Sequence, residues 1–202
     1  MAVALHYEQV AAFAPMTLYL PELSEQGFVE WCEQFPDFML EYSADGELSI
    51  MPPTSLPTGD RNNEISRQLG TWAIADGRGK AYDSSTGFLL PSGARRAPDA
   101  SWLDRARRDS AFRSGLRYPV LAPDFVIELK SPSDRMARLT EKMLEWMENG
   151  AKLGWLIDPD RQTVTIFRPG RASETLLKPL NVAGEGPVAG FVLGLDPIWN
   201  ID

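Results

Sequence analysis

The chain has 202 residues, of which 44% are hydrophobic, and its formal net charge is −8. This length and composition allow one sizeable buried core, so we expect a single domain over 1–202. The lone Cys32 excludes an intramolecular disulfide framework and a multi-cysteine zinc site. The negative charge argues against broad electrostatic binding of nucleic acid as the main task, although it allows a local contact.

No membrane segment is expected. Residues 1–16 lack the basic start of a secretory signal, and the chain has no run of about 18 apolar residues, the length that a membrane-spanning helix needs. Together with the single cysteine, this predicts a soluble protein of the reducing cytoplasm.

Hydrophobic periodicity and turn residues predict an alternation of helices and strands. In chain order we expect a helix over 24–35, a hairpin of 38–42 and 47–51, a helix over 60–75, strands within 80–90 and over 97–103, a helix and loop over 104–118, a strand over 125–130, a helix ending near 149, strands over 153–157 and 163–168, and short strands within 176–201. Ser24 is the expected N-cap of the first helix, and Ser131-Pro132-Ser133-Asp134 is the expected cap of the helix that ends near 149.

This order predicts an α/β fold, in which helices flank a mixed central sheet and an N-terminal helix and hairpin come first. Within the single domain we expect an N-terminal extension over 1–37, a core over 38–168 and C-terminal strands over 169–202.

Glu128 and Lys130 stand two positions apart on the apolar strand 125–130. Because alternate residues of a strand share a face, both charges are expected to point the same way. A carboxylate and an ammonium so placed can serve one metal-bound water. The simpler alternative is an exposed ion pair on a solvated sheet face.

Asp99, at the start of the strand 97–103, gives this pair a context. In a sheet with adjacent strands, Asp99 and Glu128 can converge on one cation. Two carboxylates, backbone carbonyls such as that of Leu129, and waters form a hard oxygen site that suits Mg²⁺ or Mn²⁺.

The segment from Arg95 to Arg117 carries seven arginines against three aspartates, whereas the whole chain is negative. Such a segment can neutralise phosphates. Its alternative is a solvated charged helix or loop, and the residues do not decide between the two.

Pro98-Asp99 followed by Glu128-Leu129-Lys130 resembles the PD-(D/E)xK nuclease motif. The longer match, from Glu41 to Arg168, is similar to the Uma2-type restriction endonucleases (DUF820), a bacterial family. It rests on an ordered series of motifs: Asp45-Gly46-Glu47-Leu48, Met51-Pro52-Pro53-Thr54, Ala97-Pro98-Asp99, Pro123-Asp124, Glu128-Leu129-Lys130-Ser131-Pro132-Ser133, Lys142 and Gly154-Trp155-Leu156-Ile157-Asp158-Pro159.

The resemblance implies a restriction-endonuclease-like core, dependence on a divalent metal and hydrolysis of phosphodiester bonds in DNA. Asp99 and Glu128 match the metal-binding acids of the motif, and Lys130 matches its lysine. Many family members have another residue at the position of Lys130 and retain a helix lysine that Lys142 matches. Lys130 is therefore the favoured catalytic lysine and Lys142 its alternative. Glu64 corresponds to an additional helix acid that binds metal in some nucleases of the superfamily, although an ordinary surface glutamate is the simpler interpretation.

We therefore expect a Mg²⁺-dependent DNA endonuclease. The alternatives are a catalytically silent nuclease-fold module that binds proteins or regulates them, and a nuclease that acts on RNA. By analogy, a homodimer would suit a duplex substrate, which has two strands to cut.

Overall fold

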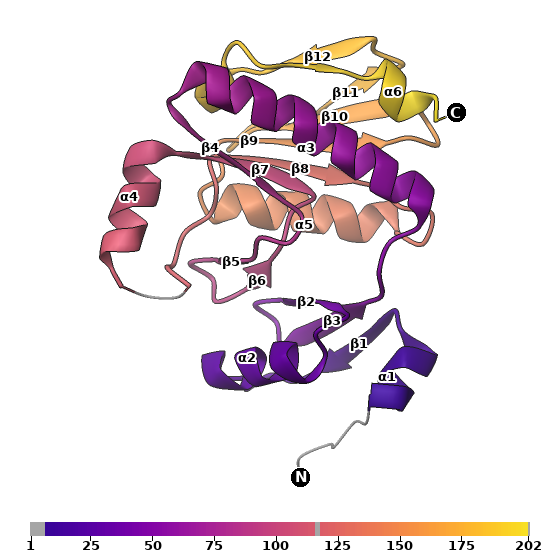
Figure 1. Cartoon of the computed structure of the whole chain (residues 1–202), viewed down its shortest axis with the longest axis vertical. Helices are drawn as coiled ribbons and strands as arrows, with labels where there is room; N and C mark the ends of the chain where they lie inside the picture. Colours follow the sequence, from indigo (N-terminus) through magenta and orange to yellow (C-terminus); the bar gives the residue numbers. More distant parts are fainter. Residues whose placement is uncertain (1–6, 116–117, 202) are drawn as a thin grey trace.

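A six-stranded mixed sheet forms the centre of the computed structural model, which describes residues 7–115 and 118–201 (Figure 1). In this sheet β8 and β9 run parallel, and each of the other neighbouring pairs is antiparallel. The spatial order of the strands is β11 (Glu174–Leu177), β10 (Thr163–Phe167), β9 (Leu153–Asp158), β8 (Phe125–Leu129), β7 (Ala100–Asp104) and β4 (Gly79–Asp83). The predicted α/β fold with a mixed central sheet is confirmed.

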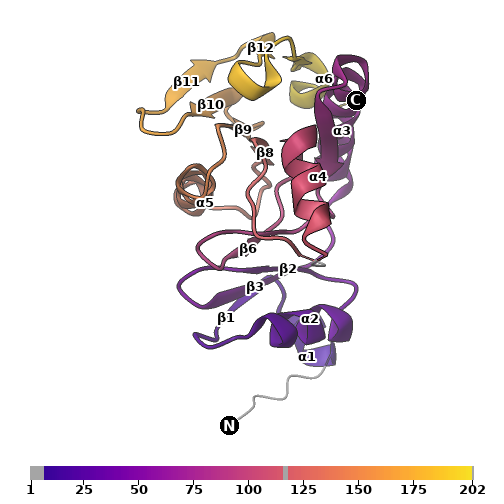
Figure 2. The ribbon, with the colours of Figure 1, turned by 90° about the vertical axis from the view of Figure 1, so that its left-hand side faces the viewer.

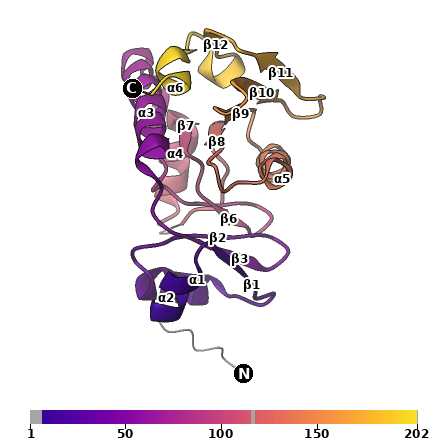
Figure 3. The same cartoon turned by 90° about the vertical axis from the view of Figure 1, so that its right-hand side faces the viewer.

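Two helices cover opposite faces of this sheet, α3 (Leu56–Asp76) and α5 (Met136–Glu148) (Figures 2 and 3). Alternate residues of β8 divide between the two faces, because Phe125 and Ile127 join the core under α3 whereas Val126 joins the core under α5. Glu128 continues the alternation of Val126 and therefore faces α5.

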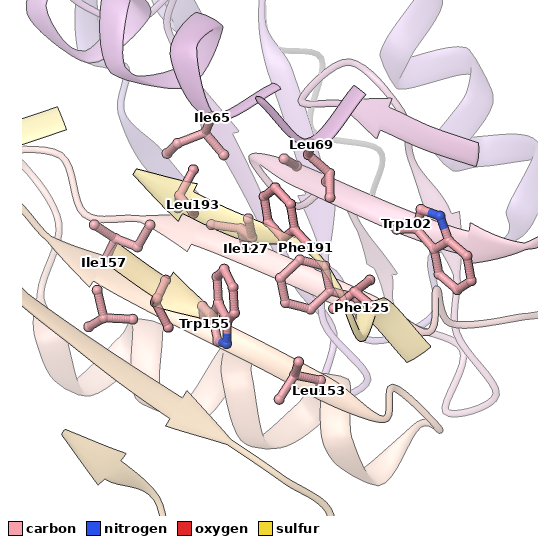
Figure 4. Close-up of a cluster of buried hydrophobic side chains, with 14 of the residues drawn as sticks. Ile65, Leu69, Trp102, Phe125, Ile127, Leu153, Trp155, Ile157, Phe191 and Leu193 are labelled. Carbon is pink, nitrogen blue, oxygen red and sulfur yellow. The ribbon is translucent and has the colours of Figure 1, made fainter. Parts of the chain in front are cut away.

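The larger core lies between α3 and the sheet (Figure 4). Aromatic and branched side chains from four strands, from α3 and from the C-terminal segment interlock there. The figure labels Ile65, Leu69, Trp102, Phe125, Ile127, Leu153, Trp155, Ile157, Phe191 and Leu193. This core packs against β7, β8 and β9, and the candidate site lies at the ends of β7 and β8.

Helix α3 begins four residues earlier than the sequence predicts, at Leu56 instead of Asp60. Proline does not prevent this start, because Pro57 lies in the first turn, where a backbone N–H has no helical partner. The helix ends as expected at Gly77, whose φ of 73° is the left-handed conformation that glycine adopts without strain. The earlier start adds a turn to α3 ahead of Asn62, which contributes to the site.

Helix α5 shows that one predicted cap is wrong. The helix begins at Met136, and Arg135 stands at its N-cap without a side-chain hydrogen bond. Ser131 and Asp134 instead close a turn of their own, in which the Ser131 N–H donates to Asp134 Oδ2 at 2.8 Å. Short polar residues compete in this way with helix capping, because their side chains bond to nearby backbone. The predicted end at Asn149-Gly150 is confirmed.

A second, five-stranded sheet lies at the N-terminal end of the molecule (Figure 1). Its spatial order is β1 (Met16–Tyr19), β3 (Glu47–Met51), β2 (Met39–Tyr42), β6 (Arg95–Arg96) and β5 (Phe88–Leu89), with α1 (Tyr7–Phe13) and α2 (Glu25–Gln34) beside it. The predicted helix with its Ser24 cap and the predicted hairpin are confirmed. The pairing of β2 with β6 brings the hairpin next to the segment that leads into Asp99.

The C-terminal segment packs beside α3 on the same face of the central sheet, where Phe191 contacts Trp72 of α3 and Phe125 and Trp155 of the sheet. It contains β12 (Asn181–Ala183), the short 3-10 helix η1 (Gly186–Val188), β13 (Val192–Gly194) and α6 (Asp196–Trp199). Two hydrogen bonds between the Gln68 side chain and the backbone of Gly194 fix it there, at 2.8 and 2.9 Å. One further helix, α4 (Arg105–Arg113), follows β7. Across 7–115 and 118–201, the structure contains no helix with the length and apolarity that membrane crossing requires.

Candidate active site

Asp99 and Glu128 lie at neighbouring positions of two adjacent strands. Ala100 of β7 pairs with Ile127 of β8 in an antiparallel register, so the next position on each strand places Asp99 beside Glu128. The two carboxyl groups are close enough for the charge of Asp99 to raise the pKa of Glu128. The sequence-predicted convergence of these two acids is therefore present in the fold.

Asp99 is held from two sides. Its Oδ1 accepts a hydrogen bond from Asn62 Nδ2 of α3 at 3.0 Å, and its Oδ2 accepts one from the Leu129 N–H at 2.7 Å. Burial raises the pKa of Asp99 above its usual range, against the opposing effects of the Leu129 N–H, Lys142 and Asn62. The Asp99 carboxylate is thus fixed in orientation and costly to keep charged without a nearby cation.

Glu128 is almost completely buried, with 2% of its surface exposed. Its Oε2 accepts a hydrogen bond from Lys142 Nζ at 2.9 Å, and its Oε1 accepts one from Trp146 Nε1 at 2.8 Å. Burial, reinforced by the charges of Asp99 and Glu41, raises the pKa of Glu128 to about 8 despite the adjacent Lys142.

Trp146 offers the first prediction, because it is fully buried and contacts the carboxyl group of Glu128. We expect Trp146→Phe to lower the free energy of unfolding by about 1–3 kcal/mol beyond the cost of the cavity it leaves, because the buried Glu128 Oε1 loses its donor. Trp155→Phe is the matched control, since it removes the same atoms from a tryptophan that is also fully buried but whose Nε1 has no hydrogen-bond partner within the described residues. Urea unfolding measures both, and equal losses would contradict a special role for the Glu128 contact.

Lys142 is the lysine that contacts Glu128. It projects from α5 and donates to three oxygens: Glu41 Oε1 at 2.8 Å, Glu128 Oε2 at 2.9 Å and the Ala97 carbonyl at 3.1 Å. Burial alone would lower the pKa of Lys142, but the carboxylates of Glu128 and Glu41 outweigh it and raise this pKa above its usual range. The ammonium group is therefore held in its charged form.

The Lys130 side chain contacts Asp160 and not Glu128. Strand β8 ends at Leu129, and Lys130 Nζ donates to Asp160 Oδ2 at 2.7 Å and to the Ser131 carbonyl at 3.5 Å. Asp160 raises the pKa of Lys130 through this hydrogen bond. Glu128 contacts Lys142 instead, so the expected pairing of Glu128 with Lys130 is not made.

Glu64 lies on α3 but does not reach the two acids. Its carboxylate accepts hydrogen bonds from Arg67 at 2.6 and 2.8 Å and from Gln68 at 2.9 Å. Residues two positions apart on a helix face different directions, and Asn62 holds the position that contacts Asp99. Sequence reasoning missed Asn62, although it precedes Ile65 and Leu69 at helical spacing in the buried stripe of α3.

Glu41 of β2 is a further acid at the site that sequence reasoning missed. It is 5% exposed, and its Oε1 accepts hydrogen bonds from Lys142 and from the Ala97 N–H, the latter at 2.9 Å. Arg96 approaches its Oε2 at 3.4 Å and also pairs with Glu145 of α5. Burial would raise the pKa of Glu41, but Lys142 and Arg96 outweigh it and lower this pKa.

The charged side chains around Asp99 and Glu128 carry more negative than positive charge, which favours binding of a cation. Four carboxylates surround two cationic side chains, a formal excess of two negative charges; the members are Glu41, Asp99, Glu128, Glu145, Arg96 and Lys142. Each carboxylate oxygen of Asp99 and Glu128 accepts one hydrogen bond and retains a second lone pair. Within the described ranges no three His, Cys, Asp or Glu side chains form a metal site, so a cation here would also need backbone oxygens and water. With that addition, the two acids suit a hard divalent ion.

Most of the arginine-rich segment is occupied by contacts within the chain. Arg96 pairs with Glu41 and Glu145, and Arg107 pairs with the buried Asp124 at 2.8 Å. Further intramolecular contacts hold Arg105 and Arg108. Arg117 lies outside the described residues. These contacts favour the structural interpretation of the segment over a stripe of phosphate-binding side chains.

Comparison with known proteins places these residues in a family. A family model described as "Uma2: Putative restriction endonuclease" matches residues 26–196, which include every residue of the site. The chain belongs to the Uma2 family. A search of curated proteins gave no match.

Among solved structures, the Uma2-family chain is similar to one described as a "putative nuclease belonging to DUF820 from Anabaena variabilis ATCC 29413". The two are 21% identical, and the similarity covers 79% of this chain and 89% of the other, with a TM-score of 0.67. At this identity the likeness establishes the fold, and it agrees with the mixed sheet and flanking helices described above.

Proposed function

We propose that this Uma2-family protein is a divalent-metal-dependent endonuclease that hydrolyses phosphodiester bonds in DNA. The observation that carries the proposal is the meeting of Asp99, Glu128 and Lys142 at the ends of β7 and β8, within the residues that match a restriction endonuclease family. Two acids and a buried ammonium group suit phosphodiester hydrolysis, which needs a metal and positive charge near the phosphate.

Asp99 and Glu128, with the Leu129 carbonyl, are the groups that would hold Mg²⁺ or Mn²⁺. The bound metal would supply a water of lowered pKa and neutralise charge on the phosphate. The Leu129 N–H and Asn62 fix the Asp99 carboxylate in orientation. Trp146 does the same for Glu128.

Lys142 would act as a donor. Its pKa is raised by Glu128 and Glu41, so it remains an ammonium at neutral pH and does not accept a proton. A protonated lysine beside the acids can orient the attacking water and stabilise negative charge that develops on the phosphate. This geometry favours Lys142 over Lys130 as the working lysine, because Lys130 Nζ is paired with Asp160.

A catalytically silent module is the second candidate. Its support is that Lys142 Nζ already donates to three oxygens within the chain, as many as an ammonium group can serve. Calorimetry with Mn²⁺ separates the candidates, since we expect the nuclease to bind the ion and the silent module not to bind it in a manner that depends on Asp99 and Glu128.

The direct test is cleavage of supercoiled plasmid DNA with Mg²⁺ or Mn²⁺. We expect nicked and linear products that EDTA abolishes and excess Mg²⁺ restores, because the two acids alone do not activate water. Single-stranded DNA and RNA of matched sequence are the comparison substrates. Cleavage that persists in EDTA, or a preference for RNA, would overturn the metal or the substrate part of the proposal.

Mn²⁺ binding should depend on pH. The metal needs the carboxylate form of Glu128, whose pKa of about 8 in the metal-free site means that a proton competes below this value. The apparent affinity is therefore expected to rise with pH, by up to about tenfold per unit below pH 8, and then to level off. Isothermal calorimetry from pH 6 to 8 in buffers of different ionisation enthalpy measures both the affinity and the released proton. An affinity independent of pH over this range would contradict the assignment of Glu128 as a ligand.

A further inference from the structure

Glu41 reaches the site from the other sheet. Strand β2 belongs to the N-terminal sheet, whereas Asp99 and Glu128 belong to the central sheet, and Figure 1 shows β2 below α5. The Glu41 carboxylate nevertheless lies 2.8 Å from Lys142 Nζ. The N-terminal sheet thus contributes a buried charge to the site.

Lys142 is shared between two carboxylates. Its three hydrogen bonds reach Glu41, Glu128 and the Ala97 carbonyl, so Glu41 and Glu128 are both its charge partners. A cation bound at Glu128 would repel the Lys142 ammonium group. It would also neutralise the Glu128 carboxylate, which could then no longer attract Lys142. Glu41 would then be the carboxylate that remains to hold Lys142.

We propose that Glu41 is a positioning residue that retains Lys142 at the site when Glu128 binds metal. The proposal rests on the proposed function, and it assigns a role to the contact between the two sheets. Glu41 is not expected to touch the metal or the substrate.

The surroundings of Glu41 suit this role. The Ala97 N–H donates to Glu41 at 2.9 Å, and Ala97 lies two residues before Asp99. The segment that carries the proposed metal ligand Asp99 therefore also fixes the Glu41 carboxylate. Arg96 compensates part of the charge and is itself fixed by Glu145. A buried carboxylate is costly without partners, so this environment keeps Glu41 ionised and stationary.

The test is calorimetry of Mn²⁺ binding to the full chain. In Glu41→Gln, Lys142 has Glu128 as its remaining carboxylate partner, so the metal must displace a stronger ion pair. We expect Mn²⁺ to bind about tenfold more weakly, which corresponds to about 1.4 kcal/mol. Glu41→Asp retains the charge and should recover most of the affinity.

Lys142→Met separates positioning from a simple loss of negative charge. If Glu41 acts through Lys142, Glu41→Gln should weaken Mn²⁺ binding much less in a Lys142→Met background than in the parent. Glu47→Gln is the matched control, since Glu47 also comes from the N-terminal sheet and approaches α5, where Arg138 lies 3.7 Å away on the surface. The Glu47→Gln variant should bind Mn²⁺ with the affinity of the parent.

Thermal unfolding establishes that each variant is folded, and DNA cleavage at saturating Mn²⁺ gives a second measurement. We expect Glu41→Gln to lower kcat with little change in KM for DNA. Unchanged Mn²⁺ affinity in Glu41→Gln, or an equal loss in both backgrounds, would overturn the inference while leaving the proposed function intact. A parent chain that neither binds Mn²⁺ nor cleaves DNA would overturn both.

Discussion

Glu128→Gln is expected to abolish metal-dependent DNA cleavage, with a loss of at least about a thousandfold, or about 4 kcal/mol of transition-state stabilisation. Glutamine has the shape of Glu128 but offers no negative charge to a metal, and its amide would place a donor near Lys142 or Trp146. Asp99→Asn should have a comparable effect, because Asp99 is the second acid at the same strand ends.

The fold of Glu128→Gln should survive. Burial raises the pKa of Glu128 to about 8, so a charge at this position is costly in the metal-free site, and a neutral glutamine avoids that cost. The amide donor that faces Lys142 or Trp146 offsets part of this gain, so thermal unfolding should show a melting temperature close to that of the parent, while plasmid nicking and Mn²⁺ binding in calorimetry are both lost. Loss of activity without loss of stability distinguishes a functional acid from a structural one.

Glu64→Gln is the matched comparison for these variants. Glu64 is bonded to Arg67 and Gln68 on α3, and its removal should leave cleavage within a few-fold of the parent. A loss as large as that of Glu128→Gln would return Glu64 to the set of metal ligands.

Local patterns were sufficient to predict the framework of the site. The alternation of Phe125, Ile127 and Val126 correctly predicted β8 and its two faces, and the turn at 43–46 correctly predicted the hairpin. Such patterns succeed because the burial of a strand face or the conformation of a turn depends on residues that are close in sequence.

The same reasoning failed for the partner of Lys130. The spacing of Glu128 and Lys130 predicts a shared strand face but does not identify the partner of either charge, and Lys142 from α5 is the partner of Glu128. Lys130 turns to Asp160, in the turn after β9.

Contacts between segments that are distant in the chain could not be predicted from the sequence either. Glu41 lies 101 positions before Lys142 and meets it because β2 pairs with β6, a contact between short strands of the N-terminal sheet. No periodicity encodes such a pairing. Asn62 differs, since a polar residue at a core position of a helix is a readable signal of a buried hydrogen bond.

The two lysines should respond differently to the same substitution. Lys142→Met is expected to lower DNA cleavage by about a hundredfold or more, the usual cost of removing a donor that stabilises developing charge. Lys130→Met should leave cleavage within a few-fold, because Lys130 forms a partly exposed pair with Asp160.

The measurement must separate catalysis from folding, because Lys142→Met leaves Glu41 and Glu128 buried without their shared cation. Such an uncompensated charge costs about 3–5 kcal/mol of stability. Lys142→Arg retains the charge but replaces a compact ammonium with a planar fork, so it should fold better than Lys142→Met and still cleave DNA poorly. Low activity in both Lys142 variants with a folded Lys142→Arg would assign the working lysine to α5. Active Lys142 variants beside an inactive Lys130→Met would instead return that role to the residue that follows β8.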